Sequence, residues 1–241
     1  NETKVFGVMG DPIGHSLSPA IHNASFKALG FPGVYLPFHI SASDFSTAIE
    51  AYQSIPVMGY SVTIPHKESA FRFATTSSDL VKKIGAANTL VKTDNGFHAE
   101  NTDATGIIAA IKNKLGETLD NRDVLILGAG GVSRAAVFAL KKAGCSVKVC
   151  NRSSERAEKL ASEAGVAVMP WSQRHDFKSG LLVNCTSVGM HPNENDSPWD
   201  SNCFTKVFTH HPILERPTRD KKFRDHRTNH FNFLLVSFFT C

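Results

Sequence analysis

The feature that most constrains the fold of this chain is a short apolar run that leads directly into a glycine-rich turn. Val124–Leu127 has the composition of a buried strand, and Gly128-Ala-Gly-Gly-Val-Ser-Arg134 follows it and opens a helical pattern. Glycines at such a junction allow a close approach to a pyrophosphate, whose charge is bound by N–H groups at the helix start. Paired glycines alone are common in structural turns, but the flanking strand and helix favour a dinucleotide-binding unit.

The next strand along the chain indicates which dinucleotide this unit would bind. Enzymes that use NAD usually place an acidic residue at the end of this strand, against the ribose 2′-hydroxyl. Here Val147–Cys150 is followed by Asn151-Arg-Ser-Ser-Glu-Arg156, in which Arg152 and Arg156 lie one helical turn apart. Two guanidinium groups suit a 2′-phosphate. A solvated helix start could carry the same residues, but their position relative to the glycine-rich turn favours NADP.

Strand-like and helical segments alternate along most of the chain, which predicts an α/β fold with a largely parallel sheet. The expected strands are Val5–Met9, Val34–Ile40, Tyr60–Ile64, Asn88–Lys92, Val124–Leu127, Val147–Cys150 and Leu181–Cys185. The expected helices are Pro19–Leu29, Ala42–Ser54, Glu68–Phe73, Asp79–Ile84, Asp103–Leu115, Val132–Ala143 and Ser154–Ala164. We divide the chain into two α/β lobes, residues 1–103 and 104–206, and a C-terminal segment, residues 207–241.

Composition and charge narrow the class of function. Of the 241 residues, 41% are hydrophobic and 20% are charged, as in ordinary soluble globular proteins, and the formal net charge is +4. This small excess predicts a small anionic ligand and no nucleic acid partner. No apolar run approaches the ~20 residues of a membrane span, so we expect no membrane partner. The five cysteines contain no Cys-x-x-Cys pair, which argues against disulfides or zinc and favours the cytoplasm.

A lysine stands where a helix should begin in Gly59-Tyr-Ser-Val-Thr-Ile-Pro-His-Lys67. Tyr60–Ile64 is expected to be a strand, and the helix Glu68–Phe73 is expected to follow. Because the macrodipole makes the start of a helix positive, a cation is disfavoured there, and the neutral amine that can accept a proton is favoured. The alternative is an exposed lysine without a role, as is usual for a lone lysine in a loop.

Polar residues that a dinucleotide-binding unit does not need occur in the first lobe. In His15-Ser-Leu-Ser-Pro19, Ser18 is expected to cap the following helix, with Pro19 at its first position. Ser16 has no such role, and two hydroxyls beside a helix N-terminus could hold a hydroxylated carboxylate. Asp103, taken alone, is expected to be the N-cap of its own helix.

Taken together, these segments resemble the shikimate dehydrogenase family, in the family's order from residue 4 to about residue 200. No single segment is specific, but the combination is. The segments are Gly10-Asp-Pro-Ile-Gly-His-Ser-Leu-Ser-Pro19, Gly59–Lys67, Gly85-Ala-Ala-Asn-Thr-Leu90, Asn101-Thr-Asp103, Gly128–Arg134, Asn151–Arg156 and Asn184-Cys-Thr-Ser-Val-Gly-Met190. The start at Asn1, close to the first strand, is also similar to the second half of a fused dehydroquinate dehydratase–shikimate dehydrogenase.

The resemblance implies a role for each lobe and for individual residues. The first lobe would bind substrate and carry the catalytic residues Lys67 and Asp103, and the second would be a Rossmann-like NADP-binding domain. The substrate would be held by Ser16 and Ser18 at its carboxylate and by Thr63, Lys67, Asn88 and Asp103 at its ring hydroxyls. The cofactor would be held by Gly128, Ala129, Gly130, Gly131 and Val132 at the pyrophosphate, by Asn151, Arg152, Ser153 and Arg156 at the 2′-phosphate, by Thr186, Ser187 and Met190, and by Asp79 from the first lobe.

The reaction implied is the reversible reduction of 3-dehydroshikimate to shikimate with NADPH, a step of the shikimate pathway of aromatic amino-acid biosynthesis. Lys67 would move the hydroxyl proton, Asp103 would orient it, and no metal would be needed. A quinate/shikimate dehydrogenase is one alternative, although the paired hydroxyls of Ser16 and Ser18 favour shikimate. The resemblance fits a monomer or a homodimer.

The resemblance ends before the C-terminal segment 207–241. The family continues with Tyr-Asn-Pro, a glycine-methionine segment and a helix that carries a substrate-binding glutamine. Here no glycine follows Gly189, no methionine follows Met190 and no glutamine follows Gln173. We therefore expect an atypical tail, a nucleotide-binding sheet without its last strands and impaired activity. A binding module without catalysis is the alternative from a different functional class.

Overall fold

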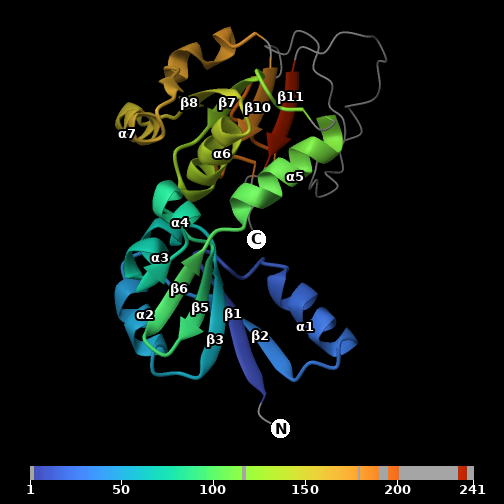
Figure 1. Cartoon of the computed structure of the whole chain (residues 1–241), viewed down its shortest axis with the longest axis vertical. Coiled ribbons are helices and arrows are strands. Elements are labelled where there is room, and N and C mark those ends of the chain that lie inside the picture. Colours follow the sequence, from blue (N-terminus) through green and yellow to red (C-terminus); the bar gives the residue numbers. More distant parts are fainter. Residues whose placement is uncertain (1–2, 116–117, 179, 190–194, 201–232, 238–241) are drawn as a thin grey trace. The chain divides into compact units, whose positions relative to one another are not determined.

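A computed structural model describes residues 3–115, 118–178, 180–189, 195–200 and 233–237. The chain divides into two compact units at the junction between Asp103 and Ala104 (Figure 1). Each unit contains one sheet with helices packed on it, so the predicted α/β class is confirmed.

In the first unit, the sheet has the strand order β2-β1-β3-β5-β6-β4 among the described residues. Its strands are β1 (Lys4–Gly10), β2 (Gly33–His39), β3 (Val57–Val62), β4 (Thr76–Ser77), β5 (Thr89–Thr93) and β6 (Gly96–Glu100), and its helices are α1 (Ser18–Ala28), α2 (Phe45–Tyr52), α3 (Lys67–Phe73) and α4 (Asp79–Ile84). β1 is parallel to β2 and β3, as predicted, whereas β5 is antiparallel to both β3 and β6. The strand β6 was not predicted, although Asp94-Asn95-Gly96 is a typical hairpin turn, and Gly96 has a φ of 121°.

Helices cover both faces of this first sheet because successive side chains of β1 point to opposite faces. Met9 belongs to a large core that includes Ile49 of α2, Ala70 of α3 and Val81 of α4. Its neighbour Val8 belongs to a smaller cluster on the other face, against which α1 packs. Figure 1 shows α1 on one side of the sheet and α2 and α3 on the other.

In the second unit, the sheet has the order β11-β10-β7-β8-β9, and every described pair is parallel. The strands are β7 (Asp123–Leu127), β8 (Ser146–Cys150), β9 (Ala167–Val168), β10 (Gly180–Asn184) and β11 (Phe233–Ser237), and the helices are α5 (Asp103–Leu115), α6 (Gly131–Lys142), α7 (Ser154–Ala164) and the 3₁₀ helix η1 (Trp171–Asp176). The central position of β7, with β8 and β10 on either side of it, is the order of a Rossmann-type sheet.

The strand β11 corrects the expectation for the C-terminal segment 207–241. Five residues of this segment pair in parallel with β10, from Gly180 opposite Phe233 to Asn184 opposite Ser237. This segment has no regular alternation of apolar and polar residues, but strands of parallel sheets are often continuous apolar runs, as Phe233-Leu-Leu-Val is. The expectation that this sheet lacks its last strands is therefore wrong for 233–237, and the rest of the segment lies outside the described residues.

Candidate active site

Four chain segments of the first unit meet at one edge of its sheet. β1 and β3 are parallel, so their carboxyl ends lie together, and the Thr63 amide donates to the Met9 carbonyl at 2.9 Å. The antiparallel strand β5 begins at the same edge, where the Val62 amide donates to the Asn88 carbonyl at 2.7 Å. β6 ends there and leads into α5. The antiparallel hairpin thus brings the residues before β5 and after β6 to the edge that carries Lys67.

Lys67 and Asp103 form a buried ion pair at this edge. The distance from Lys67 Nζ to Asp103 Oδ2 is 2.6 Å, and the two side chains are 4% and 12% exposed. Asn88 Nδ2 donates to the second carboxylate oxygen at 2.9 Å. Because a buried charge needs a partner, this geometry replaces the alternative of an exposed lysine without a role.

Two capping expectations at this edge are wrong. Asp103 is the first residue of α5 and not the residue before it, and its carboxylate is bound to Lys67 and Asn88. In α1, the N-cap is Leu17, whose side chain makes no capping bond, and Ser18 is the first helical residue. Its amide donates to Ser16 Oγ at 3.3 Å, so Ser16 has the capping contact that we assigned to Ser18.

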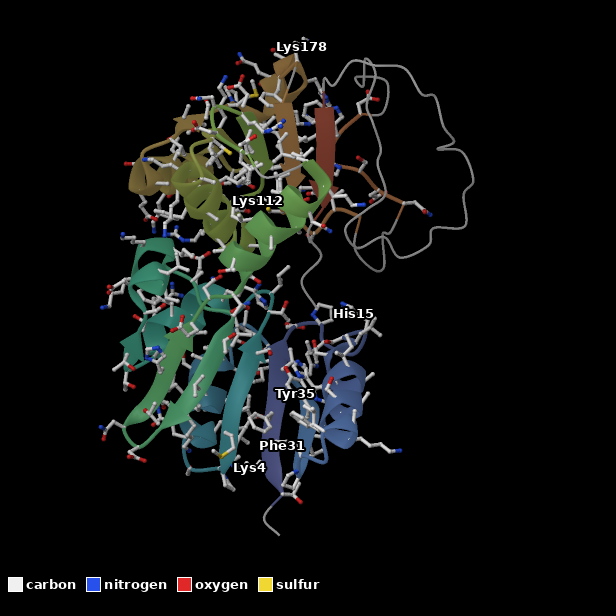
Figure 2. The ribbon with its side chains drawn as sticks, turned by 45° about the vertical axis from the view of Figure 1, so that its right-hand side comes forward. Lys4, His15, Phe31, Tyr35, Lys112 and Lys178 are labelled. Atoms are coloured by element: carbon white, nitrogen blue, oxygen red, sulfur yellow. The ribbon has the colours of Figure 1, made fainter. Side chains whose placement is uncertain are left out.

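Ser16, Ser18 and Thr63 all follow the carboxyl ends of β1 or β3. Figure 2 shows His15, next to Ser16, at the end of the first sheet opposite to Lys4. Ser16 and Ser18 are half-buried, and Thr63 is buried. A Cβ on Gly10 would lie 2.5 Å from Cγ2 of Thr63, so a glycine is needed where β1 ends against this threonine. The structure therefore places the predicted substrate residues at the edge that carries the ion pair.

The predicted cofactor residues of the second unit share one edge of its sheet, because β7, β8 and β10 are parallel. The Gly128 amide donates to the Cys150 carbonyl at 2.8 Å, and the Cys185 amide donates to the Leu127 carbonyl at 2.9 Å. Gly128 has a φ of 112°, and a Cβ there would lie 2.8 Å from Ser133 Oγ. A Cβ on Gly130, by contrast, would meet nothing within 4 Å. The open space at Gly130, at the start of α6, fits the approach of a pyrophosphate.

The arginines after β8 lie beside this turn. Arg156 Nη2 donates to the carbonyl of Ala129 at 3.4 Å, which links α7 to the glycine-rich turn. Ser153 caps α7, since its side chain accepts from the Arg156 amide, and Asn151 Nδ2 donates to the Ser153 carbonyl at 3.1 Å. Arg152 and Arg156 are both exposed, which leaves their guanidinium groups accessible to a phosphate. The residues present fit an NADP cofactor.

The other predicted cofactor residues have different surroundings. The Thr186 hydroxyl donates to Asn184 Oδ1 at 2.7 Å and accepts from the Val188 amide, so it shapes the loop after β10. Ser187 in the same loop is exposed. Met190 lies outside the described residues. Asp79 is the first residue of α4 in the first unit and forms an exposed ion pair with Lys82 at 3.1 Å.

Two residues next to the ion pair were given no role by the sequence analysis. His66 is 1% exposed, its Nε2–H donates to the Ile40 carbonyl at 2.7 Å, and its ring stacks on Phe45. Burial lowers the pKa of His66, against smaller opposing effects of Ile40 and Asp11, and so favours the neutral form of this ring. Asn101, 4% exposed, is the second. Both stand within the segments that carry the resemblance, but only burial shows their importance.

Within the part of the chain that the structure describes, no three histidine, cysteine, aspartate or glutamate side chains come together as a metal site would require. Among the same residues, no helix combines the length and apolar composition needed to cross a membrane.

Comparisons with known proteins identify the family and the fold of this chain. Residues 8–90 match the shikimate dehydrogenase substrate binding domain, and residues 109–179 match shikimate/quinate 5-dehydrogenase. A shikimate dehydrogenase (NADP(+)) of Caldanaerobacter subterraneus is 35% identical over 227 residues, which cover 90% of this chain and 80% of the relative.

Two further relatives add a ligand complex and a fusion. The crystal structure of a shikimate 5-dehydrogenase from Thermus thermophilus, in complex with NADP(H) and shikimate, is 34% identical with a TM-score of 0.71, over 83% of this chain and 74% of that one. A bifunctional 3-dehydroquinate dehydratase/shikimate dehydrogenase of Arabidopsis thaliana is 36% identical over 214 residues, which cover 82% of this chain and 35% of the relative.

Proposed function

This chain belongs to the shikimate dehydrogenase family, and from that premise we propose that it catalyses the reversible, NADP-dependent reduction of 3-dehydroshikimate to shikimate. The observation that carries the proposal is the buried pair of Lys67 and Asp103, at the sheet edge shared by Ser16, Ser18 and Thr63. The unit before Ala104 would bind the substrate, and the unit that follows would bind the cofactor.

The proposed chemistry divides between the cofactor and Lys67. When bound, NADPH supplies the hydride. In the direction of reduction, the ammonium group of Lys67 donates a proton to the substrate carbonyl oxygen, and in oxidation the neutral amine takes the proton of the substrate hydroxyl. Asp103 Oδ2 holds Nζ at 2.6 Å, and Asn88 holds the other carboxylate oxygen at 2.9 Å. The atom that exchanges the proton therefore has a fixed position, and the burial of both charges limits competition from water.

The proposed cofactor site uses the two glycine positions differently. Gly128 is required by the turn itself, whereas Gly130 leaves open space at the start of α6 for the pyrophosphate. Arg152 and Arg156 would bind the 2′-phosphate, with Asn151 and Ser153 shaping the loop between them. Thr186, Ser187, Met190 and Asp79 remain proposed cofactor contacts.

A lysine substitution tests the proposal. Lys67→Ala should lower turnover by roughly 10²–10⁴-fold, with a much smaller loss of shikimate affinity, because proton transfer is lost while other hydrogen bonds remain. Lys27→Ala, at an exposed position near the end of α1, is the matched control and should leave turnover unchanged. NADPH formation with shikimate measures turnover, and calorimetry measures binding. Turnover that survives Lys67→Ala would restrict Lys67 to binding.

Two alternative functions would be recognised by different results in the same turnover and binding assays. A higher kcat/KM with quinate than with shikimate would favour a quinate/shikimate dehydrogenase. Binding of shikimate and NADP by the unmutated chain without any turnover would instead favour a binding module.

The cellular setting is also part of the proposal. The Arabidopsis relative is fused to a dehydroquinate dehydratase, which supports a similar partner domain for this chain. The absence of a Cys-x-x-Cys pair from the sequence supports a reducing compartment such as the cytoplasm. The genomic sequence upstream of the codon for Asn1 tests the fusion, and sedimentation of the purified chain distinguishes a monomer from a homodimer.

A further inference from the structure

Asn101 joins the two chain segments that carry Asn88 and Asp103. Its Nδ2 donates to the Ala86 carbonyl at 2.9 Å, and its Oδ1 accepts from the Asp103 amide at 3.0 Å. The first bond holds the loop that precedes Asn88. The second satisfies a backbone donor at the start of α5, where helices leave amides without partners. One buried side chain thus fixes the loop and the helix start relative to each other.

The loop that precedes Asn88 is also bonded to Lys67, the third residue of the site. The Ala87 amide donates to the Lys67 carbonyl at 2.8 Å. A movement of the loop therefore changes the position of the Lys67 backbone, the side chain of Asn88 and the start of α5 together. Asn101 lies where these three segments meet.

We propose that Asn101 is a positioning residue, which sets the mutual placement of Lys67, Asn88 and Asp103 without contacting the substrate. The inference rests on the proposed function of the same site. Its physical reason is that proton transfer is sensitive to displacements of about 1 Å, which cost on the order of 10²-fold in rate. Asn101 is 4% exposed, and removal of its side-chain amide would leave the buried Ala86 carbonyl and the partly buried Asp103 amide without these partners.

The first unit contains a matched control for this substitution. Asn23, on α1, also bonds both backbone groups of a distant segment: its Nδ2 donates to the Tyr35 carbonyl at 2.9 Å, and its Oδ1 accepts from the Tyr35 amide at 2.8 Å. Asn23 thus makes the same two kinds of bond as Asn101, but it holds β2 and no proposed catalytic residue.

The experiment compares Asn101→Ala with Asn23→Ala in the full chain. Asn101→Ala should lower kcat by roughly 10–100-fold, with a smaller change in KM, whereas Asn23→Ala should leave kcat within about 2-fold. Amide hydrogen exchange, followed by NMR, should accelerate by about 10-fold or more at Ala87 and Asp103 in the first variant, and at Tyr35 in the second. Equal kcat values for the two variants, or unchanged exchange at Ala87 and Asp103, would overturn the proposal.

Two further variants separate positioning from general stability. Asn101→Asp keeps the acceptor for the Asp103 amide and loses the donor to Ala86, so exchange should accelerate at Ala87 and remain slow at Asp103. Asn101→Ala in a Lys67→Ala background should cause no further loss of kcat, because positioning acts through Lys67; an additive loss contradicts it. If the unmutated chain shows no turnover, the proposed function fails, and the exchange rates alone decide whether Asn101 holds the three segments.

Discussion

Replacing Asp103 by alanine leaves Lys67 buried without its counter-ion, and the structure indicates how much the free energy of unfolding should fall. Removing one partner of a buried ion pair typically costs about 3–5 kcal/mol. Asn88 loses one hydrogen bond to the carboxylate but keeps its bonds to Thr102, so this loss adds about 1 kcal/mol at most to the destabilisation. Because Asp103 is 12% exposed and the pair is not fully dry, we expect the loss of the ion pair to cost about 3 kcal/mol, the lower end of its range, and the total to be about 4 kcal/mol.

The chain allows each unit to be followed separately. Its three tyrosines (35, 52 and 60) lie in the first unit, and its two tryptophans (171 and 199) lie in the second. Second-derivative tyrosine absorbance during urea unfolding should therefore show the loss of stability in Asp103→Ala, while tryptophan fluorescence should not. Asp79→Ala removes the partner of an exposed ion pair, with side chains 60% and 92% exposed, and should change little. A cost for Asp103→Ala as small as that of Asp79→Ala would refute the reasoning, because Lys67 would then have water or another partner available.

Three other predictions concern the cofactor residues and pH. Gly130→Ala should weaken NADP binding, measured by cofactor titration, and leave the stability of the second unit unchanged. Gly128→Ala should instead destabilise that unit by about 1–3 kcal/mol in urea unfolding, because a φ of 112° is strained for alanine. Replacing Arg152 and Arg156 by alanine should weaken NADP by about 1.5–3 kcal/mol per arginine and NAD far less; equal losses in titration would contradict the 2′-phosphate assignment. Because burial lowers the pKa of His66, the unfolded chain binds a proton at this histidine more readily than the folded chain does. The contribution of His66 to the free energy of unfolding should therefore be fully present above pH ~6.5, the ordinary histidine pKa, and fall as the pH drops below it. His66→Gln should flatten this dependence in urea unfolding at a series of pH values.

Local sequence patterns predicted elements well where one signal dominated. The glycine-rich turn between β7 and α6 and the helix α7 after it were predicted within a residue or two, because glycine and a serine N-cap act locally. The strand β5 was predicted, but β6, its partner in the hairpin, was missed because it is short and half polar. The strand β11 was missed because a continuous apolar run has no period.

The site was less predictable than the elements, since its geometry depends on contacts between distant segments. Sequence placed Lys67 at the start of α3, but the burial of Lys67 depends on Asp103, 36 positions away. The local preference of Asp103 for a cap was overridden by that pair. Asn101 gave no signal by itself, because an asparagine in a turn and a buried asparagine that bridges two segments look the same in sequence.

The position of β11 in the chain has a consequence for synthesis. The described strands of the first unit lie within residues 4–100, so that sheet can form while the rest of the chain is still being translated. In the second unit, β10 is complete long before Phe233–Ser237 leaves the ribosome, and until then its free edge has unpaired amides and carbonyls. Ribosome-bound chains long enough to expose β10 should therefore depend on chaperones or associate through β10, and this dependence should end when β11 has left the ribosome and paired with β10.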